Sequence, residues 1–366
     1  MTLPLLRVEG APYEQGLAHG RELKDRVNHN LSVYFNRFEK EVGLSEAEVM
    51  ACAVPFVNAI QLQNPDYYQG MKGIAEGAGV SLEALTALNV RYEILYYHYG
   101  VNAMADGCTA FAVQPEAAEN GHLWIGQNWD WIPEVQGAII HTFDSDGFET
   151  IAFTECGIFG GKIGLNAAGV GLAINGMTST DDNWTKLHKP FHVRCYEILK
   201  ARDFESATRV VLDEDRVCAA NYLIACTHDH VVDIEAAPTK VNLVTCENGR
   251  QAHANHFIDP DGLGIVEPPM DNRPHSQERH RRMTELLNSK DKLTFEDLKT
   301  FLLDKENYPY SINRHKDMDL PPEERFITVT SVIMDLHAGE IYLTDGPPDE
   351  SEYQLVHLKH MGAVPH

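Results

Sequence analysis

The spacing of apolar residues changes between Gly107 and Cys108, and this change limits what the chain can fold into. Before it, apolar side chains recur every three or four residues, as at Leu23, Val27 and Leu31, which is the spacing of an amphipathic helix. After it, short strand-like runs alternate with Gly, Asn and Asp, as expected of antiparallel strands and their turns. A block of helices followed by a strand region predicts an α+β fold rather than repeating βαβ units.

The expected elements follow this division of the chain. In the first part, helices are expected at residues 23–38, 67–78 and 81–92. Another is expected after Ser45, because Ser45 and Glu48 form a capping-box pattern. Pro55 is expected to kink or interrupt that helix. In the second part, strands are expected at residues 109–113, 123–128, 138–143, 150–154, 161–165, 169–175, 221–227, 231–235, 328–336 and 340–344. Four helices are expected among them, at residues 192–201, 204–212, 276–287 and 294–303.

Length and charge restrict the kind of protein. The 366 residues allow either two domains or one large unit, and because no repeat or low-complexity linker divides them we expect a single domain over residues 1–366. The 30 basic and 54 acidic residues give a net charge of −24. This argues against binding to nucleic acid or to an anionic membrane surface, because phosphates repel a protein of this sign.

Cysteine usage and the N-terminal residues predict the compartment. Seven cysteines, an odd number without C-x-x-C spacing, favour free thiols in a reducing environment. The first residues lack the basic region and long apolar core of a signal peptide, and the longest uncharged stretches contain Pro, Asn, Gln or Gly. We therefore expect a soluble cytoplasmic protein without a membrane segment, and a chain of this length needs no metal or disulfide for its stability.

Cys108 is the cysteine whose position suggests chemistry. It follows the turn dipeptide Asp106-Gly107, and a glycine before a nucleophile leaves its own carbonyl open to attack. The thiol can attack the Gly107 carbonyl, form a thioester by an N-to-S shift and, after hydrolysis, leave a chain that begins with Cys108. The new α-amine, with a reference pKa of about 7.7–8.0, would serve as base beside the nucleophile. On these residues alone, an unreactive buried cysteine is the commoner interpretation.

Three further polar residues are candidates for the same site. Asp130, in a run that returns soon after Cys108, is a candidate to orient the amine. Asn255 carries an amide of the kind that stabilises an oxyanion, and Arg314 is a candidate to bind a substrate carboxylate. Each also has an ordinary structural explanation, as a turn residue, a loop residue or a salt-bridge partner.

Two other functions remain open at this point. The chain has 18 histidines, and His228-Asp229-His230 and the pair His253 and His256 are candidate ligands of a metal-dependent hydrolase. No H-E-x-x-H motif or comparable third-ligand spacing accompanies them, which argues against that alternative. A non-catalytic binding protein is the alternative outside enzymes.

Several segments together carry a resemblance to a known family, although each alone is unspecific. They are spread over nearly the whole chain: Gly10–Gly20, Leu88–Glu93, Asp106–Thr109, Gly126–Asp130, Thr154–Gly157, Gly164–Val170, His253–His256 and Glu306–Ser311. In content and order they resemble the acyl-coenzyme A:aminopenicillanate (isopenicillin N) acyltransferase family, which are autoproteolytic N-terminal-nucleophile cysteine hydrolases.

The resemblance implies a four-layer αββα sandwich, the N-terminal-nucleophile hydrolase fold. It also implies cleavage after Gly107 into a helical α chain, 1–107, and a catalytic β chain, 108–366, which stay together, either as one unit or in a homo-oligomer. Cys108 would be the nucleophile and Asn255 the oxyanion donor, with Asp130, Arg314 and Asn175 as further polar residues of the site. The implied substrate is a linear amide or an acyl thioester, with an acyl-Cys108 intermediate, transfer to water or an amine, and no cofactor or metal.

The sequence therefore predicts that the purified protein consists of two polypeptides, residues 1–107 and 108–366. Denaturing electrophoresis and intact-mass measurement should show both, with Cys108 as a new N-terminus. A Cys108→Ala variant lacks the thiol that attacks Gly107 and should remain one chain of 41.0 kDa. A wild-type protein that stays intact after long incubation would contradict self-processing.

Overall fold

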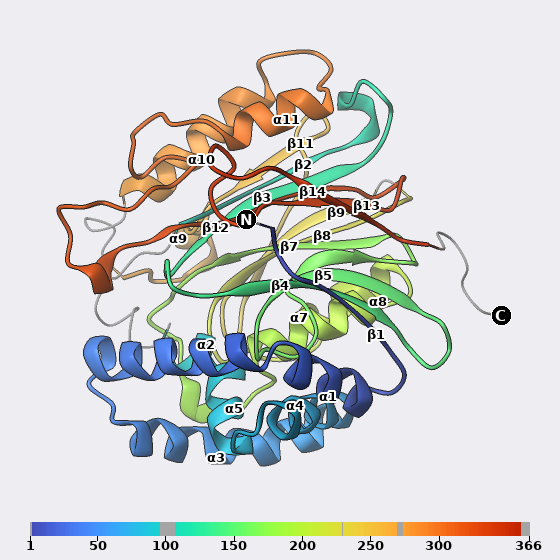
Figure 1. Ribbon diagram of the computed structural model, residues 1–366. Helices are drawn as coiled ribbons and strands as arrows, with labels where there is room; N and C mark the ends of the chain where they lie inside the picture. Colours follow the sequence, from blue (N-terminus) through green and yellow to red (C-terminus); the bar gives the residue numbers. More distant parts are fainter. Residues whose placement is uncertain (1, 96–106, 229, 269–273, 360–366) are drawn as a thin grey trace.

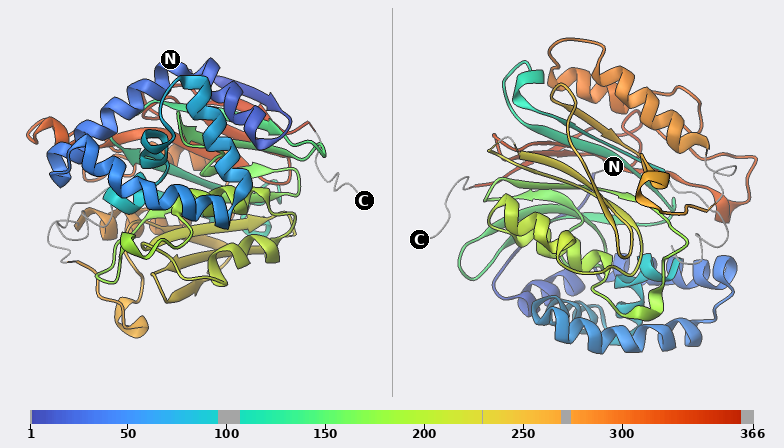
Figure 2. Two further views of the ribbon diagram at one scale, coloured as in Figure 1. Left: turned by 90° about the horizontal axis from the view of Figure 1, so that it is seen from below. Right: turned by 180° about the vertical axis from the view of Figure 1, so that it is seen from behind.

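The computed structural model describes residues 2–95, 107–228, 230–268 and 274–359. Two β-sheets pack face to face in the middle of the molecule, and helices cover the outer face of each, which gives a four-layer αββα order (Figure 1). Views from below and from behind show the same layers (Figure 2). The α+β class and the sandwich predicted from the sequence are confirmed.

The larger sheet has eight strands in the order β1-β4-β5-β6-β7-β8-β9-β10. Its first pair, β1 with β4, is parallel and the other pairs are antiparallel. Most of its strands are buried on both faces, since one face meets helices and the other meets the second sheet. The strands span Leu5–Glu9 (β1), Gly137–Phe143 (β4), Glu149–Glu155 (β5), Ile163–Asn166 (β6), Val170–Gly176 (β7), Ala220–Cys226 (β8), His230–Ala236 (β9) and Val241–Val244 (β10).

The smaller sheet has six antiparallel strands in the order β11-β2-β3-β12-β13-β14. The strands span Arg250–His253 (β11), Cys108–Val113 (β2), Trp124–Trp131 (β3), Ile327–Asp335 (β12), Glu340–Leu343 (β13) and Gln354–His357 (β14). Along β2, Ala110 and Ala112 belong to the core between the sheets, whereas Phe111 and Val113 pack into a second core under the outer helices. This alternation is the period of a strand buried on both faces.

Helices form the two outer layers. Outside the smaller sheet lie α10 (Pro274–Leu287) and α11 (Phe295–Leu302), while a one-turn helix, α9 (Pro260–Leu263), precedes them in the chain. The capping box predicted for Ser45 with Glu48 is present, and Thr294 with Asp297 forms a second at the start of α11. The other outer layer, below the larger sheet in Figure 1, consists of α1 (Pro12–Glu22), α2 (Lys24–Arg37), α3 (Glu46–Gln63), α4 (Pro65–Ala78), α5 (Leu82–Asn89), α7 (Phe191–Lys200) and α8 (Phe204–Leu212).

Some predictions about single elements were wrong. Helix α3 runs through Pro55 without interruption, with Val49, Phe56 and Ile60 of the same helix fully buried. Strands β1, β10, β11 and β14 lie where the sequence predicted none, because four or five residues are too short to show a strand period. Residues 1–107 are therefore not purely helical, since they supply β1 to the larger sheet.

A buried group of charges joins the helical layer to the larger sheet. Glu155, the last residue of β5, contacts Arg91, Lys162 and the hydroxyl of Tyr34. The charged side chains are almost completely buried. Burial alone would raise the pKa of Glu155, but Arg91 and Lys162 hold it far below its ordinary value. The negative charge of Glu155 thus compensates two buried cations in a region of low dielectric.

Within the described residues, no single helix is long and apolar enough to cross a membrane. One bent pair, Lys24–Val42 with Glu46–Gln63, meets the length and composition criteria when its two parts are taken together, and its parts meet at 105°.

We expect Glu155→Gln to lower the free energy of unfolding by about 3–5 kcal/mol, because it leaves Arg91 and Lys162 buried without their anion. The matched control is Glu296→Gln, which breaks a surface ion pair with Lys299 and should cost about 1 kcal/mol or less. Urea unfolding of the two variants measures both values. Equal losses of stability would contradict the role given to Glu155.

Candidate active site

Cys108 is the first residue of β2, which lies between β11 and β3 in the smaller sheet. It is opposite Trp129 on β3, whereas the pairing with β11 reaches only to Ala110, opposite His253. Cys108 is 1% exposed and belongs to the core between the two sheets. The candidate nucleophile thus lies where β2 enters the sandwich.

Asn255, just beyond the end of β11, contacts the nitrogen of the Gly107–Cys108 peptide bond. Its Oδ1 accepts a hydrogen bond from the Cys108 amide at 2.8 Å. Its Nδ2 donates to the carbonyl of Gly176, the last residue of β7, at 2.9 Å. Its own backbone N–H donates to Oγ of Ser276 on α10 at 2.8 Å. Asn255 is therefore held by the larger sheet and by α10 together.

Arg279, also on α10, contacts the same part of the chain. Its Nη1 donates to the carbonyl of Cys108 at 2.6 Å and to Oγ1 of Thr109 at 2.9 Å. Its Nη2 donates to Oδ1 of Asn255 at 2.9 Å. The guanidinium thus binds both the candidate nucleophile and the candidate oxyanion donor.

Gly107 is closely surrounded by charged side chains. A Cβ atom at this position would lie 2.4 Å from Nη1 of Arg314, 2.9 Å from Oδ2 of Asp130 and 3.3 Å from Nη2 of Arg279. A side chain there would have to displace the Arg314 guanidinium or the Asp130 carboxylate, so glycine is the residue that leaves these groups in place. One carboxylate and two guanidinium groups, far apart in sequence, therefore converge on the residue before Cys108.

Asp130 and Arg314 are linked through Thr328 on β12. The Thr328 hydroxyl donates to Oδ1 of Asp130 at 2.7 Å and accepts the backbone N–H of Arg314 at 3.0 Å. The guanidinium carbon of Arg314 lies 5.4 Å from the ring centroids of both Tyr310 and Phe326, which hold the cation between two aromatic rings. In the described part of the chain its buried Nη1 has no hydrogen-bond acceptor, so a donor remains for a ligand.

Asn175 lies beside this group rather than within it. Its Oδ1 accepts a hydrogen bond from Asn221 on β8 at 3.0 Å, and its buried Nδ2 has no acceptor among the residues that the structure describes. Its link to the site is the next residue, Gly176, whose carbonyl binds Asn255. The structure therefore brings Cys108 and the three other polar candidates together and places Asn175 at their border.

A further cation lies on the thiol side of β2. Nζ of Lys162 is 3.2 Å from the ring centroid of Trp129, the residue opposite Cys108, and the lysine interacts electrostatically with Cys108. Burial lowers the pKa of Lys162 to about 7, against the opposing effect of Glu155. The buried charge group of the fold thus reaches the candidate nucleophile.

The histidines proposed as metal ligands have partners within the protein. Nε2 of His253 is 2.8 Å from Oε1 of Glu235, and Nδ1 of His256 is 2.7 Å from Oγ of Ser276. Burial opposes the charged imidazole, but Asp233 and Glu235 raise the pKa of His253 to about 9. Of the other candidate group, Asp229 lies outside the described residues.

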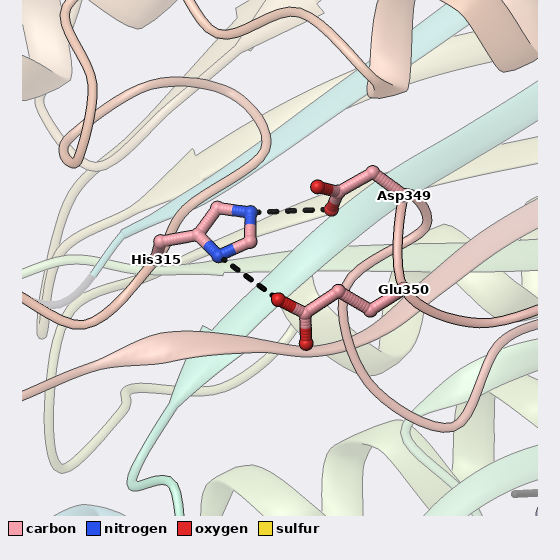
Figure 3. Close-up of side chains that lie close together, drawn as sticks. All are labelled: His315, Asp349 and Glu350. Carbon is pink, nitrogen blue, oxygen red and sulfur yellow. Dashed lines mark hydrogen bonds and ion pairs between the residues drawn. The ribbon is translucent and has the colours of Figure 1, made fainter.

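One group in the described ranges has the spacing of a three-ligand cation site, namely His315, Asp349 and Glu350 (Figure 3). The two nitrogens of His315 lie 3.1 Å from Asp349 and 3.6 Å from Glu350. Asp349 also accepts hydrogen bonds from Lys305 at 2.5 Å and from Asn313 at 2.7 Å. A lysine ammonium group already neutralises the central carboxylate.

This group holds the residues on both sides of Arg314, because Asp349 binds Asn313 and His315. Burial would raise the pKa of Asp349, but Lys305 and these neighbours lower it to about 2. We therefore interpret the group as a set of hydrogen bonds, with one Lys305–Asp349 ion pair, that fixes the Arg314 segment.

Sequence reasoning missed three residues of the site, Ser276, Arg279 and Thr328. Arg279 belongs to the run Arg279-His280-Arg281-Arg282, in which nothing marks one arginine as buried. Once a helix over 276–287 is predicted, the one available signal is spacing: Ser276 and Arg279 are three residues apart and share a helix face. Thr328 carries no sequence signal beyond its place in a strand.

The chain has a four-layer αββα sandwich with a polar site at the start of a central strand. A family model described as acyl-coenzyme A:6-aminopenicillanic acid acyl-transferase matches residues 117–350, more than half of the chain. The chain belongs to this family. The matched region contains Asp130, Asn175, Asn255 and Arg314 and begins after Cys108.

Individual proteins show similarity to the chain at different levels. Acyl-coenzyme A:6-aminopenicillanic-acid-acyltransferase 40 kDa form from Emericella nidulans is 28% identical over 309 residues, which are 84% of this chain and 83% of that protein. A mutant conjugated bile acid hydrolase from Clostridium perfringens is 12% identical, with a TM-score of 0.46 over 71% of this chain and 99% of that chain. An N-acylethanolamine-hydrolyzing acid amidase orthologue from Caenorhabditis elegans is 13% identical, with a TM-score of 0.45 over 63% of this chain and 93% of that chain.

We expect Gly107→Ala to slow the appearance of the Cys108 N-terminus by roughly 100-fold, because the new methyl group displaces Arg314 or Asp130 from the reacting bond. Gly121→Ala is the control: a Cβ there meets no atom within 4 Å, so its only cost is the backbone strain of a positive φ (68°), far from the site. The cleaved fraction is measured against time by intact mass. Cleavage of Gly107→Ala at the wild-type rate would contradict the crowding described above.

Proposed function

We propose that the protein is a self-processing cysteine amidohydrolase or acyltransferase that acts through an acyl-Cys108 intermediate. The observation that carries the proposal is the hydrogen bond from the Cys108 amide to Asn255, beside a Gly107 that is packed against Asp130 and Arg314. The bond to be cut and the polar groups that would assist its cleavage thus lie together in the uncut chain.

Self-processing begins when the Cys108 thiol attacks the Gly107 carbonyl carbon. The bond between that carbon and the Cys108 nitrogen breaks, the nitrogen takes up the thiol proton, and Gly107 is left as a thioester on Cys108. Water then hydrolyses the thioester to a Gly107 carboxylate and a free thiol. The products are an α chain of residues 1–107 and a β chain of residues 108–366 that begins with a free amine.

In turnover, the α-amine of Cys108 accepts the thiol proton, and the sulfur attacks the acyl carbon of the substrate. The oxyanion is stabilised by Nδ2 of Asn255, because the hydrogen bond to Gly176 uses only one of its two hydrogens. The amine returns the proton to the leaving group, which departs as an amine or a thiol. Water or an acceptor amine then takes the acyl group from Cys108.

The substrate class follows from the family and from the charges of the site. The Emericella nidulans relative is named for an acyl-coenzyme A, which is a thioester, and for 6-aminopenicillanic acid, which is an amine. In this chain the buried Nη1 of Arg314 supplies a donor suited to an anionic or carbonyl oxygen of the substrate. We therefore propose linear acyl amides and acyl thioesters as substrates.

The decisive assay tests N-acyl amides and acyl-coenzyme A thioesters of graded chain length with the cut protein, each with and without an amine acceptor. Iodoacetamide should abolish turnover in proportion to alkylation of Cys108, read from the mass of the N-terminal peptide of the β chain. Cys52→Ala is the matched control, because Cys52 is a half-buried cysteine far along the chain from β2 and its loss should leave turnover unchanged.

The other candidate functions give different results in the same assay. Inactivation by a chelator with the Cys108 thiol unmodified would favour a metal-dependent hydrolase. A cut protein that turns over no acyl amide or thioester would favour a binding protein. Full activity after complete alkylation of Cys108 would overturn the nucleophile assignment.

A further inference from the structure

Arg279 binds the start of β2 through several hydrogen bonds, although the proposed reaction gives it no role. It donates hydrogen bonds to Cys108, Thr109 and Asn255 at 2.6–2.9 Å, and it is 3% exposed. The chemical steps above assign it no proton and no bond to substrate. Its contacts therefore call for another explanation.

The contacts of Arg279 and Asn255 replace a missing piece of β-ladder. The pairing of β2 with β11 ends at Ala110 and His253, so continued pairing would place a strand backbone beside Cys108. Instead, Oδ1 of Asn255 accepts the Cys108 N–H, as a strand carbonyl would, and Nη1 of Arg279 donates to the Cys108 carbonyl, as a strand N–H would. Two side chains thus hold the first residue of β2 where backbone pairing has ended.

Arg279 also reinforces the direction of the Asn255 amide, which the Cys108 N–H and the Gly176 carbonyl favour as well. A guanidinium can only donate hydrogen bonds, so the atom of Asn255 that faces it has to be the oxygen. The NH₂ group is then turned toward Gly176, with one hydrogen left for an oxyanion. Without the guanidinium, only the Cys108 N–H and the Gly176 carbonyl would hold the amide in this orientation, and cleavage turns that N–H into part of a terminal amine.

The need for such contacts increases after cleavage. In the uncut chain Cys108 is restrained by covalent bonds on both sides, whereas in the cut chain only the bond to Thr109 remains. The side-chain contacts of Asn255 and Arg279 would then restrain the end that carries both the thiol and the amine. Displacement of about 1 Å at a reacting group is enough to cost a large factor in rate.

We propose that Arg279 is a positioning residue, which orients the amide of Asn255 and anchors the N-terminal Cys108 after cleavage. This inference rests on the proposed function, because it assigns Arg279 to the same reaction. Arg279 touches no reacting atom in this scheme and acts through Cys108 and Asn255.

The charge of Arg279 adds an effect that a purely structural contact would not have. The charged groups around Cys108 are Asp130 from β3, Arg314 from the segment before β12, Lys162 from the segment before β6, and Arg279 from α10. The two guanidinium groups outweigh the single anion Asp130, while Glu155 offsets the charge of Lys162, so the surroundings lower the pKa of the α-amine. Removal of the Arg279 charge should therefore shift the acidic limb of the pH profile of kcat/KM to higher pH.

The test compares wild type, Arg279→Met, Arg279→Lys and the control Arg281→Met over pH 5–9, all as full chains that have been incubated until cut. Arg279→Met should lower kcat/KM by roughly 100-fold and move the acidic limb upward by roughly one pH unit. Arg279→Lys keeps the charge but not the forked donors, so it should lower kcat and leave the limb in place. Arg281 is on the same helix but half exposed, in surface ion pairs, and its variant should match wild type.

The outcomes separate this inference from the proposed function. If the wild type is active and Arg279→Met has the same rate and pH profile, the positioning role is overturned and the proposed function stands. A wild type that is neither cut nor active overturns both. If Arg279→Met does not fold, Arg279→Lys decides, because wild-type kcat in that variant overturns the positioning role.

Discussion

The site depends on how β2 begins. The strand runs between β3 and β11, but at Cys108 only β3 still faces it as a strand, and side chains from the other elements complete the pairing. Asn255 and Arg279 reach Cys108 from this open side, and Asp130 and Arg314 reach Gly107. The start of β2 thus has polar side-chain partners because its pairing with β11 stops two residues before Cys108.

Burial limits the arrangements that these polar side chains can adopt. Between two sheets, a polar group without a partner costs more than it would in water, so each donor and acceptor has a restricted set of arrangements. The same reasoning applies to the charge group of Arg91, Glu155 and Lys162, in which one carboxylate holds two cations. That group connects residues before the Gly107–Cys108 bond to residues after it, so it would keep the two chains together after a cut.

Much of the fold was accessible from the sequence because its elements are long enough to show a period. The strands of the sheet interior and the helix expected at 294–303 were predicted close to their observed limits, and Ser45 marked where α3 begins. Short strands were not predicted, and β11 is the important case. From the sequence, His253–His256 was a polar segment; in the structure His253 ends β11, and Asn255 follows just beyond the strand and reaches Cys108. Arg279 was hidden for a similar reason, since one arginine in a basic run looks like its neighbours.

The sequence by itself determined the α+β class, the position of the helix-to-strand change and the candidacy of Cys108, Asp130, Asn255 and Arg314, because these follow from local periodicity and ordered motifs. Only the tertiary structure decided which of these groups meet, that Asn175 stands at the border, and that Arg279, Ser276 and Thr328 take part. The physical reason is that convergence depends on strand order and helix placement, which bring residues 107, 130, 255, 279 and 314 together across separations that no local pattern encodes.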